Sequence, residues 1–390
     1  MRDELERVGP FARLLRWLGP WTSDTDAPQD VRVEHWILRR GRLHGLRAFK
    51  AGVRLDEPGP SILDAYVYSP RGRAYGTFVI SPGLHFAGPD DPRFIRFCRV
   101  LSGAGFVVVA PFIPAYVDLR VVRSAVDDFE IVVEETARRF ASLGRPTLFS
   151  ISFGSWLALE VAARRPELVD GVITFGGYED FEGVCRFAVT GIMRTDEGEV
   201  VLARDPLNAP ALFLNLLRYL DVPGETYDLE VALSKMCHMT WGRMELKEEG
   251  RLLPFVESLV ATVPAPQRDY FRVFCGVEGG APALVDTALA RSAAVDAHAS
   301  PREALQRFER PVVICHARDD DVIPYGEALR LERALRGRVP CRLHLTGLYG
   351  HSGQGTVSPR GIAAEVGALL SIAKALSDGG RLRETLTGGG

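Results

Sequence analysis

The amino-acid sequence predicts an α/β fold, with a mostly parallel, doubly wound sheet and a helical segment inserted into it. Two stretches, one ending near residue 177 and the other running from 311 to 377, alternate short apolar runs with amphipathic helical runs. Strands joined by helices through short connections form parallel sheets with right-handed crossovers. Between the two stretches the alternation stops for about 130 residues, too many for a simple loop. The sequence therefore indicates an insertion within one α/β domain.

Length and composition are those of a globular chain with a large core. The 390 residues are 46% hydrophobic and 25% charged, and 47 basic against 50 acidic residues leave a net charge of −3. This balance excludes wholesale disorder and offers no electrostatic footprint for nucleic acid. The first ten residues do not form a secretory signal, and no apolar stretch reaches the roughly 20 residues that span a bilayer. We therefore expect a cytoplasmic protein without a transmembrane segment.

The N-terminal region predicts a helix, a linker and antiparallel strands. Residues 1–30 form an extension that contains the amphipathic run FARLLRWL. We expect this helix to dock on the main domain, the alternative being contact with a membrane surface or a lid. Three strand-like runs bounded by Gly or Pro follow, VRVEHWIL, AYVYSP and GTFVIS.

The central elements alternate regularly. DPRFIRFCRVLSGAG predicts a helix, FVVVAPF a buried parallel strand, and the stretch from Ser124 to Gly144 a helix with one apolar face. PTLFSIS, FGSWLALEVAARR and VDGVITFGG then predict strand, helix and strand, and after the insertion PVVICHARDD and CRLHLTGL predict two further strands, each followed by a helix. We thus predict a core of residues 31–177 and 311–377, a mainly helical insertion at 178–310, and a disordered glycine-rich tail at 378–390.

A serine lies at the turn between the predicted strand PTLFSIS and the helix after it. The sequence there is Ser150-Ile151-Ser152-Phe153-Gly154. Small residues two positions on either side of a nucleophile allow the sharp strand-to-helix turn called the nucleophile elbow. This context predicts Ser152 as the nucleophile, with Ser150, inside the strand, as the weaker alternative.

A serine hydroxyl needs a base to take its proton and an acid to orient that base. Asp320 follows the strand PVVIC, and His351 follows the strand CRLHLTGL, so both lie where the carboxyl ends of parallel strands meet. Phe153 and Leu84 would supply the backbone N–H groups of an oxyanion hole, Leu84 from the loop SPGLHFAG.

With the motifs SISFG, ARDDDVIP and YGHSG, the chain resembles the α/β-hydrolase-fold serine hydrolases, and among them the capped esterases and lipase-like members. The resemblance covers roughly residues 65–177 and 311–377, and makes the insertion the variable cap. Its register, with the acid four residues before Pro324, selects Asp320. The chain departs from the pattern at Pro82-Gly83, where His-Gly is frequent, and at Ser150, where Gly is usual. Serine at position 152 argues against dehalogenases and epoxide hydrolases, which carry Asp there.

Other polar residues near these motifs have a less specific interpretation. Asp180, at the end of the strand before the insertion, is a rival acid. Asp319 and Asp321 flank Asp320 and are expected to be solvated carboxylates, because the spaced ligands of a calcium loop are missing. His85 is expected to be structural or solvated rather than a substrate contact.

The insertion and the cysteines point to neither a metal nor a redox centre. His238 follows Cys237 directly, and neighbours on a helix point in different directions. The six cysteines form no CxxC pair, so we expect reduced thiols. We expect the aromatic and apolar residues of the insertion to form the core of the insertion itself, among them Phe213, Leu214, Leu217 and Tyr219.

The resemblance implies a carboxylic ester hydrolase that works through an acyl-enzyme intermediate on a small-molecule acyl substrate, without a metal or organic cofactor. Two alternatives stay open. The acyl group could pass to another acceptor, as in an acyltransferase or thioesterase using the same triad. The protein could also be a non-catalytic binding protein that retains the fold. The sequence determines neither the substrate nor the oligomeric state, because specificity depends on the cap.

Overall fold

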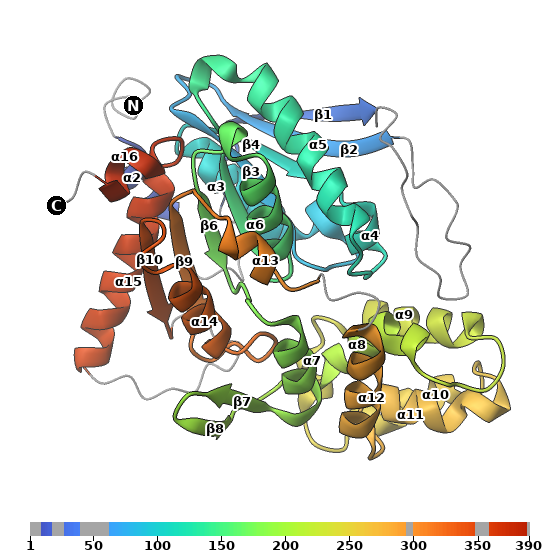
Figure 1. Ribbon diagram of the computed structural model, residues 1–390. Helices are drawn as coiled ribbons and strands as arrows, with labels where there is room; N and C mark the ends of the chain where they lie inside the picture. Colours follow the sequence, from blue (N-terminus) through green and yellow to red (C-terminus); the bar gives the residue numbers. More distant parts are fainter. Residues whose placement is uncertain (1–8, 18–26, 40–61, 294–298, 348–358, 388–390) are drawn as a thin grey trace.

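The computed structural model describes residues 9–17, 27–39, 62–293, 299–347 and 359–387 (Figure 1). An eight-stranded sheet forms its centre, in the order β1-β2-β4-β3-β5-β6-β9-β10. β1 and β2 are antiparallel, as are β2 and β4, and all other pairs are parallel. The strands are β1 (Val31–Arg39), β2 (Ile62–Pro70), β3 (Gly76–Ser81), β4 (Phe106–Pro111), β5 (Thr147–Ile151), β6 (Val172–Phe175), β9 (Val312–Ala317) and β10 (Cys341–Thr346). The predicted fold class is confirmed.

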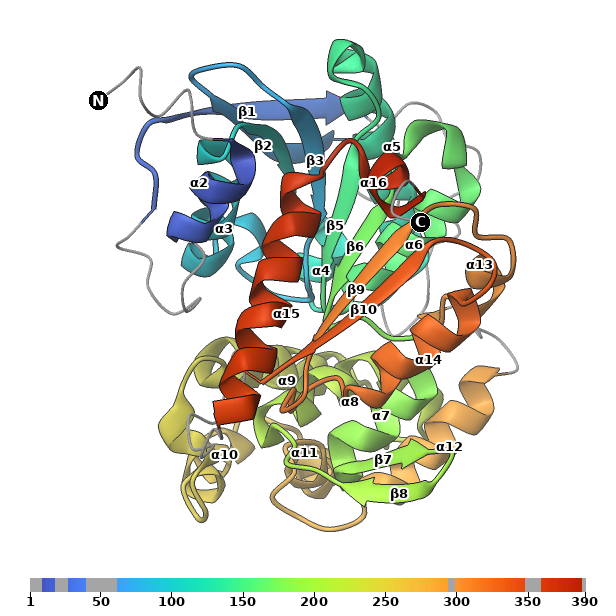
Figure 2. The same ribbon diagram turned by 90° about the vertical axis from the view of Figure 1, so that its left-hand side faces the viewer.

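Helices cover both faces of the sheet (Figure 2). One face packs against α5 (Ser124–Arg139), α6 (Gly154–Arg164), α13 (Arg302–Gln306) and α14 (Gly326–Leu335). The other packs against α2 (Pro10–Trp17), α3 (Pro92–Gly103), α15 (Pro359–Ser377) and α16 (Leu382–Thr387). β3, β4 and β9 are buried along their whole length, as expected of continuous apolar runs between two helical layers.

Between β6 and β9 the chain leaves the sheet, and we refer to residues 178–310 as the insert. Its elements are α7 (Phe181–Thr190), β7 (Ile192–Thr195), β8 (Gly198–Val201), α8 (Ala209–Leu216), α9 (Tyr227–Thr240), α10 (Leu252–Val260), α11 (Arg268–Phe274), α12 (Ala281–Ala293) and α13. Most of it lies beyond the carboxyl ends of the strands (Figure 1). Buried there are side chains such as Phe213, Leu214 and Leu217, which form a hydrophobic cluster with Phe271 and Phe274.

The antiparallel pair β7–β8 is the part of the insert that the mainly helical pattern of its sequence did not indicate. Gly198 has a φ of +133°, which side-chain-bearing residues rarely adopt, and begins the returning strand. Each strand is only four residues long, and β8 is exposed throughout. Strands this short and this exposed carry too little alternation of apolar residues to be recognised in a sequence.

The first and last helices that the structure describes, α2 and α16, join the same hydrophobic cluster on one face of the sheet. Leu14 of α2 is fully buried beside α3, which confirms a docked helix. The disorder expected for 378–390 is wrong for residues 378–387. Leu382 is 1% exposed, its N–H donates to Asp170 Oδ2 at 2.6 Å, and Gly380 N–H donates to Thr147 Oγ1 at 2.7 Å. The burial of Leu382 and these hydrogen bonds tie the glycine-rich segment to the sheet. No helix in these described ranges is long and apolar enough to cross a membrane.

Candidate active site

Ser152 lies in a strained backbone conformation between β5 and α6. Its φ is +52°, and Leu119 is the only other non-glycine residue with a positive φ in the described part of the chain. A side-chain-bearing residue in this region costs about 1–3 kcal/mol and persists only where its surroundings enforce it. The enforcing contacts include a hydrogen bond of 2.8 Å from Ser152 N–H to Phe175 C=O on the neighbouring strand. The chain therefore makes a sharp strand-to-helix turn, here called the elbow, with Ser152 at its apex.

The elbow packs directly against the loop that follows β3. A Cβ atom on Gly154 would lie 2.4 Å from Pro82 O and 2.5 Å from Ser81 O, so only glycine fits there. Ser81 Oγ donates to Gly154 C=O at 2.8 Å, which fixes the same approach. Ser150 is fully buried, and its hydroxyl has no hydrogen-bond partner among the described residues. Burial makes Ser150 inaccessible to a substrate.

Replacing Gly154 by alanine is expected to lower the free energy of unfolding by about 1–3 kcal/mol or more, because the added methyl group meets two backbone oxygens that cannot move freely. Chemical denaturation of both proteins measures the difference. Gly279→Ala is the matched control, since a Cβ atom there meets nothing within 4 Å. Equal destabilisation in the two variants would contradict the close approach.

Two backbone N–H groups near Ser152 have no hydrogen-bond partner among the described residues. Phe153 follows Ser152, and Leu84 follows Gly83, whose hypothetical Cβ atom would lie 3.7 Å from Ser152 Cβ. Neither the Phe153 nor the Leu84 N–H donates to any residue that the structure describes. The carbonyl of Phe153, by contrast, accepts a hydrogen bond of 2.9 Å from the Tyr116 hydroxyl. An oxyanion hole requires N–H groups without other partners, so Phe153 and Leu84 stay the predicted donors.

Asp320 lies beside the elbow. A Cβ atom on Gly176, at the end of β6, would be 3.3 Å from Asp320 Oδ2 and 4.0 Å from Ser152 Cα, so both residues flank the same glycine. Asp320 Oδ1 accepts the N–H groups of Val322 and Ile323, both at 2.9 Å. Burial raises the pKa of the Asp320 carboxyl above its ordinary value, while these two N–H groups and His316 oppose the rise.

The rival acid, Asp180, is occupied elsewhere. Its Oδ1 accepts the N–H of Glu182 at 3.1 Å and so caps α7, and its Oδ2 pairs with Arg302 at 3.0 Å. Its own N–H donates to the buried Glu327 carboxylate at 2.8 Å. These contacts give Asp180 a structural role and favour Asp320 as the acid.

His351 lies outside the described residues, so its place in the site stays a prediction. The chain that leads to it is nevertheless well placed. Thr346, the last residue of β10, pairs with Ala317, the last residue of β9. Its carbonyl accepts the N–H of Arg318 at 2.7 Å. Thr346 therefore lies next to the loop that carries Asp320.

The parallel strands, the antiparallel start, the elbow after β5 and the helix layers on both faces now define the fold. The chain has the α/β-hydrolase fold. No protein-family model matches the sequence, and no curated protein matches it.

Solved structures of this fold are similar to the chain over most of its length. Brefeldin A esterase, a bacterial homologue of human hormone-sensitive lipase, is 15% identical, with 97% of this chain and 86% of that chain covered and a TM-score of 0.47. The 2-hydroxy-6-oxo-6-phenylhexa-2,4-dienoate hydrolase of Rhodococcus is 16% identical, with 89% and 99% covered and a TM-score of 0.41. An acylaminoacyl peptidase of Pyrococcus horikoshii is 12% identical, with a TM-score of 0.41; 90% of this chain covers 41% of that protein. At such identities the likenesses do not bear on this chain's substrate.

The loop around Asp320 contains two contacts that the sequence did not indicate. His316, fully buried on β9, donates its Nε2–H to Ile323 C=O at 2.8 Å, and the same nitrogen lies 3.6 Å from Asp320 Oδ2. The expectation that Asp321 is solvated is wrong. Its side chain is 14% exposed and pairs with Lys247 of the insert at 3.0 Å. Residues 74 positions apart in the chain make this contact, so no local pattern announces it.

The other histidines near the site pack against aromatic rings. His85 Nδ1 accepts the N–H of Ala87 at 3.1 Å, and burial lowers the pKa of its imidazole. Its ring stacks on Phe86, with the two centroids 4.5 Å apart. His238 stacks on Phe86 as well. The His85 ring is thus held by contacts within the loop, and its expected role as a structural or solvated residue stays a prediction.

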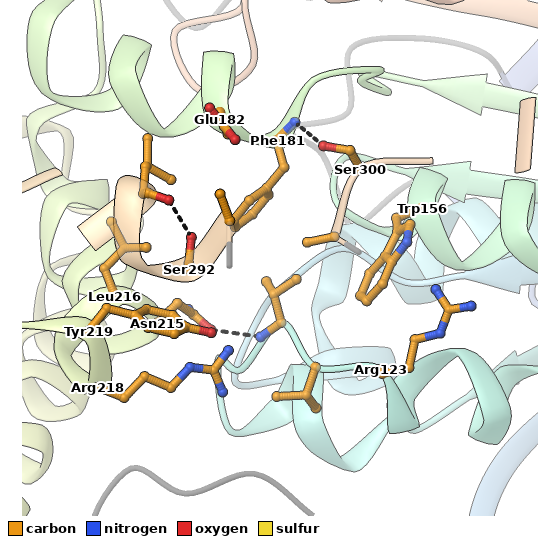
Figure 3. Close-up of a pocket in the computed structure, with 15 residues that line it drawn as sticks. Arg123, Trp156, Phe181, Glu182, Asn215, Leu216, Arg218, Tyr219, Ser292 and Ser300 are labelled. Carbon is orange, nitrogen blue, oxygen red and sulfur yellow. Dashed lines mark hydrogen bonds between the residues drawn. The ribbon is translucent and has the colours of Figure 1, made fainter. Parts of the chain in front are cut away.

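A cleft lies between the insert and the core (Figure 3). Its lining includes Trp156 of α6, Phe181 of α7, and Arg218 and Tyr219 beyond α8. Neither Ser152 nor Asp320 is among its lining residues. The centroid of the Phe181 ring, however, lies 6.3 Å from that of the Phe153 ring. A side chain that lines the cleft thus contacts the residue that follows Ser152.

Proposed function

We propose that the protein is a serine hydrolase that cleaves carboxylic esters through an acyl-enzyme intermediate. The observation that carries the proposal is the strained Ser152, at φ +52°, with Asp320 on the other side of Gly176. Strain of this kind concentrates at functional sites. The serine is followed by an N–H that makes no other hydrogen bond within the described ranges, as an acyl-transfer site requires.

In the proposed reaction, Ser152 Oγ forms a bond to the carbonyl carbon of the ester while His351 accepts the hydroxyl proton. The carbonyl oxygen becomes an oxyanion that the N–H groups of Phe153 and Leu84 stabilise. His351 then gives the proton to the leaving alcohol as its C–O bond breaks. Water, giving a proton to His351, then forms a bond to the acyl carbon. The bond to Ser152 Oγ breaks, His351 returns the proton to Oγ, and the carboxylic acid leaves. Asp320 keeps the imidazole in the required tautomer and stabilises its protonated form.

The insert would act as a cap with an apolar underside. Leu84 and Phe181 pack against both the core cluster and the hydrophobic cluster of the insert. An acyl chain bound between these side chains would be removed from water. Each buried methylene group would contribute about 0.8 kcal/mol of favourable binding free energy. We therefore propose esters with an apolar acyl group as the substrate class.

Treatment with a fluorophosphonate tests the proposal, because only an activated serine reacts with this reagent near neutral pH. We expect one adduct per chain by intact mass, located on Ser152 by peptide mapping. The label should be absent from Ser152→Ala and retained in Ser150→Ala, whose substituted residue is buried. An unlabelled wild-type protein, or a label that persists in Ser152→Ala, would reject the assignment.

A further inference from the structure

A lysine of the insert holds the acid loop through two carboxylates. Lys247, at the end of the 3-10 turn Met244–Lys247, lies with its Nζ 2.8 Å from Asp205 Oδ2 and 3.0 Å from Asp321 Oδ2. The three side chains are between 13% and 18% exposed. The N–H of Asp205 also donates to Asp321 C=O at 2.8 Å. The residue fastened in this way directly follows Asp320.

The same stretch of the insert also holds the loop that carries Leu84. The ring of Phe86, two residues after Leu84, is stacked by His238 at 4.2 Å between centroids and an interplanar angle of 20°. Trp241 lies 6.0 Å from Phe86 and is itself anchored, since its Nε1–H donates to Leu207 C=O at 3.0 Å. One short segment, residues 238–247, thus contacts both loops that flank Ser152.

We propose that Lys247 is a positioning residue, which sets the acid loop against the elbow and makes the catalytic geometry depend on the seated insert. This inference rests on the proposed function. The physical reason lies in the charges: a poorly exposed ammonium shared by two carboxylates offsets their mutual repulsion. Without the ammonium, the two carboxylates that now lie 2.8 and 3.0 Å from Nζ would repel each other, and this repulsion would displace the backbone at Asp321. Asp320, one residue away, moves with it.

The rate constant for fluorophosphonate labelling of Ser152, together with kcat and KM for an ester that the wild type cleaves, tests this role. Lys247→Met is expected to lower the labelling rate and kcat by about 10–100-fold, the effect of a displacement of about 1 Å, with KM nearly unchanged. Lys247→Arg should restore most of the rate because it keeps the charge. Lys235→Met is the matched control, since Lys235 is exposed on α9, and should behave as the wild type.

A double variant distinguishes the ion pair from a general loss of stability. Asp321→Asn alone should slow the reaction less than Lys247→Met does, because it weakens the contact with Lys247 without leaving two carboxylates unneutralised. Lys247→Met with Asp321→Asn should be no slower than Lys247→Met, because residues that act through one contact are not additive. If Lys247→Met does not fold, Asp321→Asn carries the same test. Wild-type rates in Lys247→Met, or additive losses in the double variant, would overturn the role of Lys247. Absence of labelling in the wild type would instead reject the proposed function.

Discussion

Ser152→Ala is expected to lower kcat for ester hydrolysis by at least about 10⁴-fold, and His351→Ala to do the same. The serine variant lacks the atom that forms the acyl-enzyme, and the histidine variant lacks the group that takes its proton. Because the two act as one unit, the double variant should be hardly slower than either single variant. Steady-state rates with an activated ester, measured at saturating substrate, provide the comparison.

Ser150→Ala is the control for this experiment, because it removes a hydroxyl two residues away that is fully buried on β5. It should keep most of the activity. Losses that multiply in the double variant, or a damaging Ser150→Ala beside an active Ser152→Ala, would contradict the shared mechanism of Ser152 and His351.

Asp320→Asn is expected to reduce kcat by about 10⁴-fold, because an amide favours the wrong tautomer of the imidazole and does not stabilise its protonated form. Stability should not fall with activity. The asparagine Oδ1 can still accept the N–H groups of Val322 and Ile323. Burial raises the pKa of Asp320 in the folded chain, so its ionisation lowers the free energy of unfolding as the pH rises through that pKa. At neutral pH the variant should therefore melt at the wild-type temperature or above it.

Asp180→Asn separates the two candidate acids. Asparagine caps a helix as well as aspartate does, so α7 keeps its first turn. The lost ion pair with Arg302, whose side chain is 49% exposed, should cost at most about 1 kcal/mol. Activity should stay near that of the wild type. A severe loss in Asp180→Asn with an active Asp320→Asn would show that the acid follows β6, as Asp180 does, and not β9.

Much of the core can be predicted from local sequence, because burial repeats along a strand or helix with a fixed period. The apolar runs of β4 and β9 and the apolar face of α5 each occupy a single stretch of chain. The elbow can be predicted because it, too, depends on neighbouring residues. Its requirements, small residues around Ser152 between a strand and a helix, lie within five consecutive residues.

Short polar strands and glycine-rich ends are harder, since their order comes from the surface on which they pack. β8 has no buried residue, and α16 is held by Leu382 and by hydrogen bonds to residues more than 200 positions earlier. The sequence of each segment therefore contains no pattern that predicts its structure.

The sequence by itself determined the α/β class, the position of the insert and the candidate Ser152, because each depends on neighbours in the chain. Only the tertiary structure decided that Asp180 is occupied by α7 and Arg302, that Asp320 shares Gly176 with Ser152, and that Asp321 is held by Lys247 rather than by water. These outcomes depend on which charges and donors the folded chain brings within about 3 Å of one another, since hydrogen bonds and buried ion pairs act over that distance and not along the sequence.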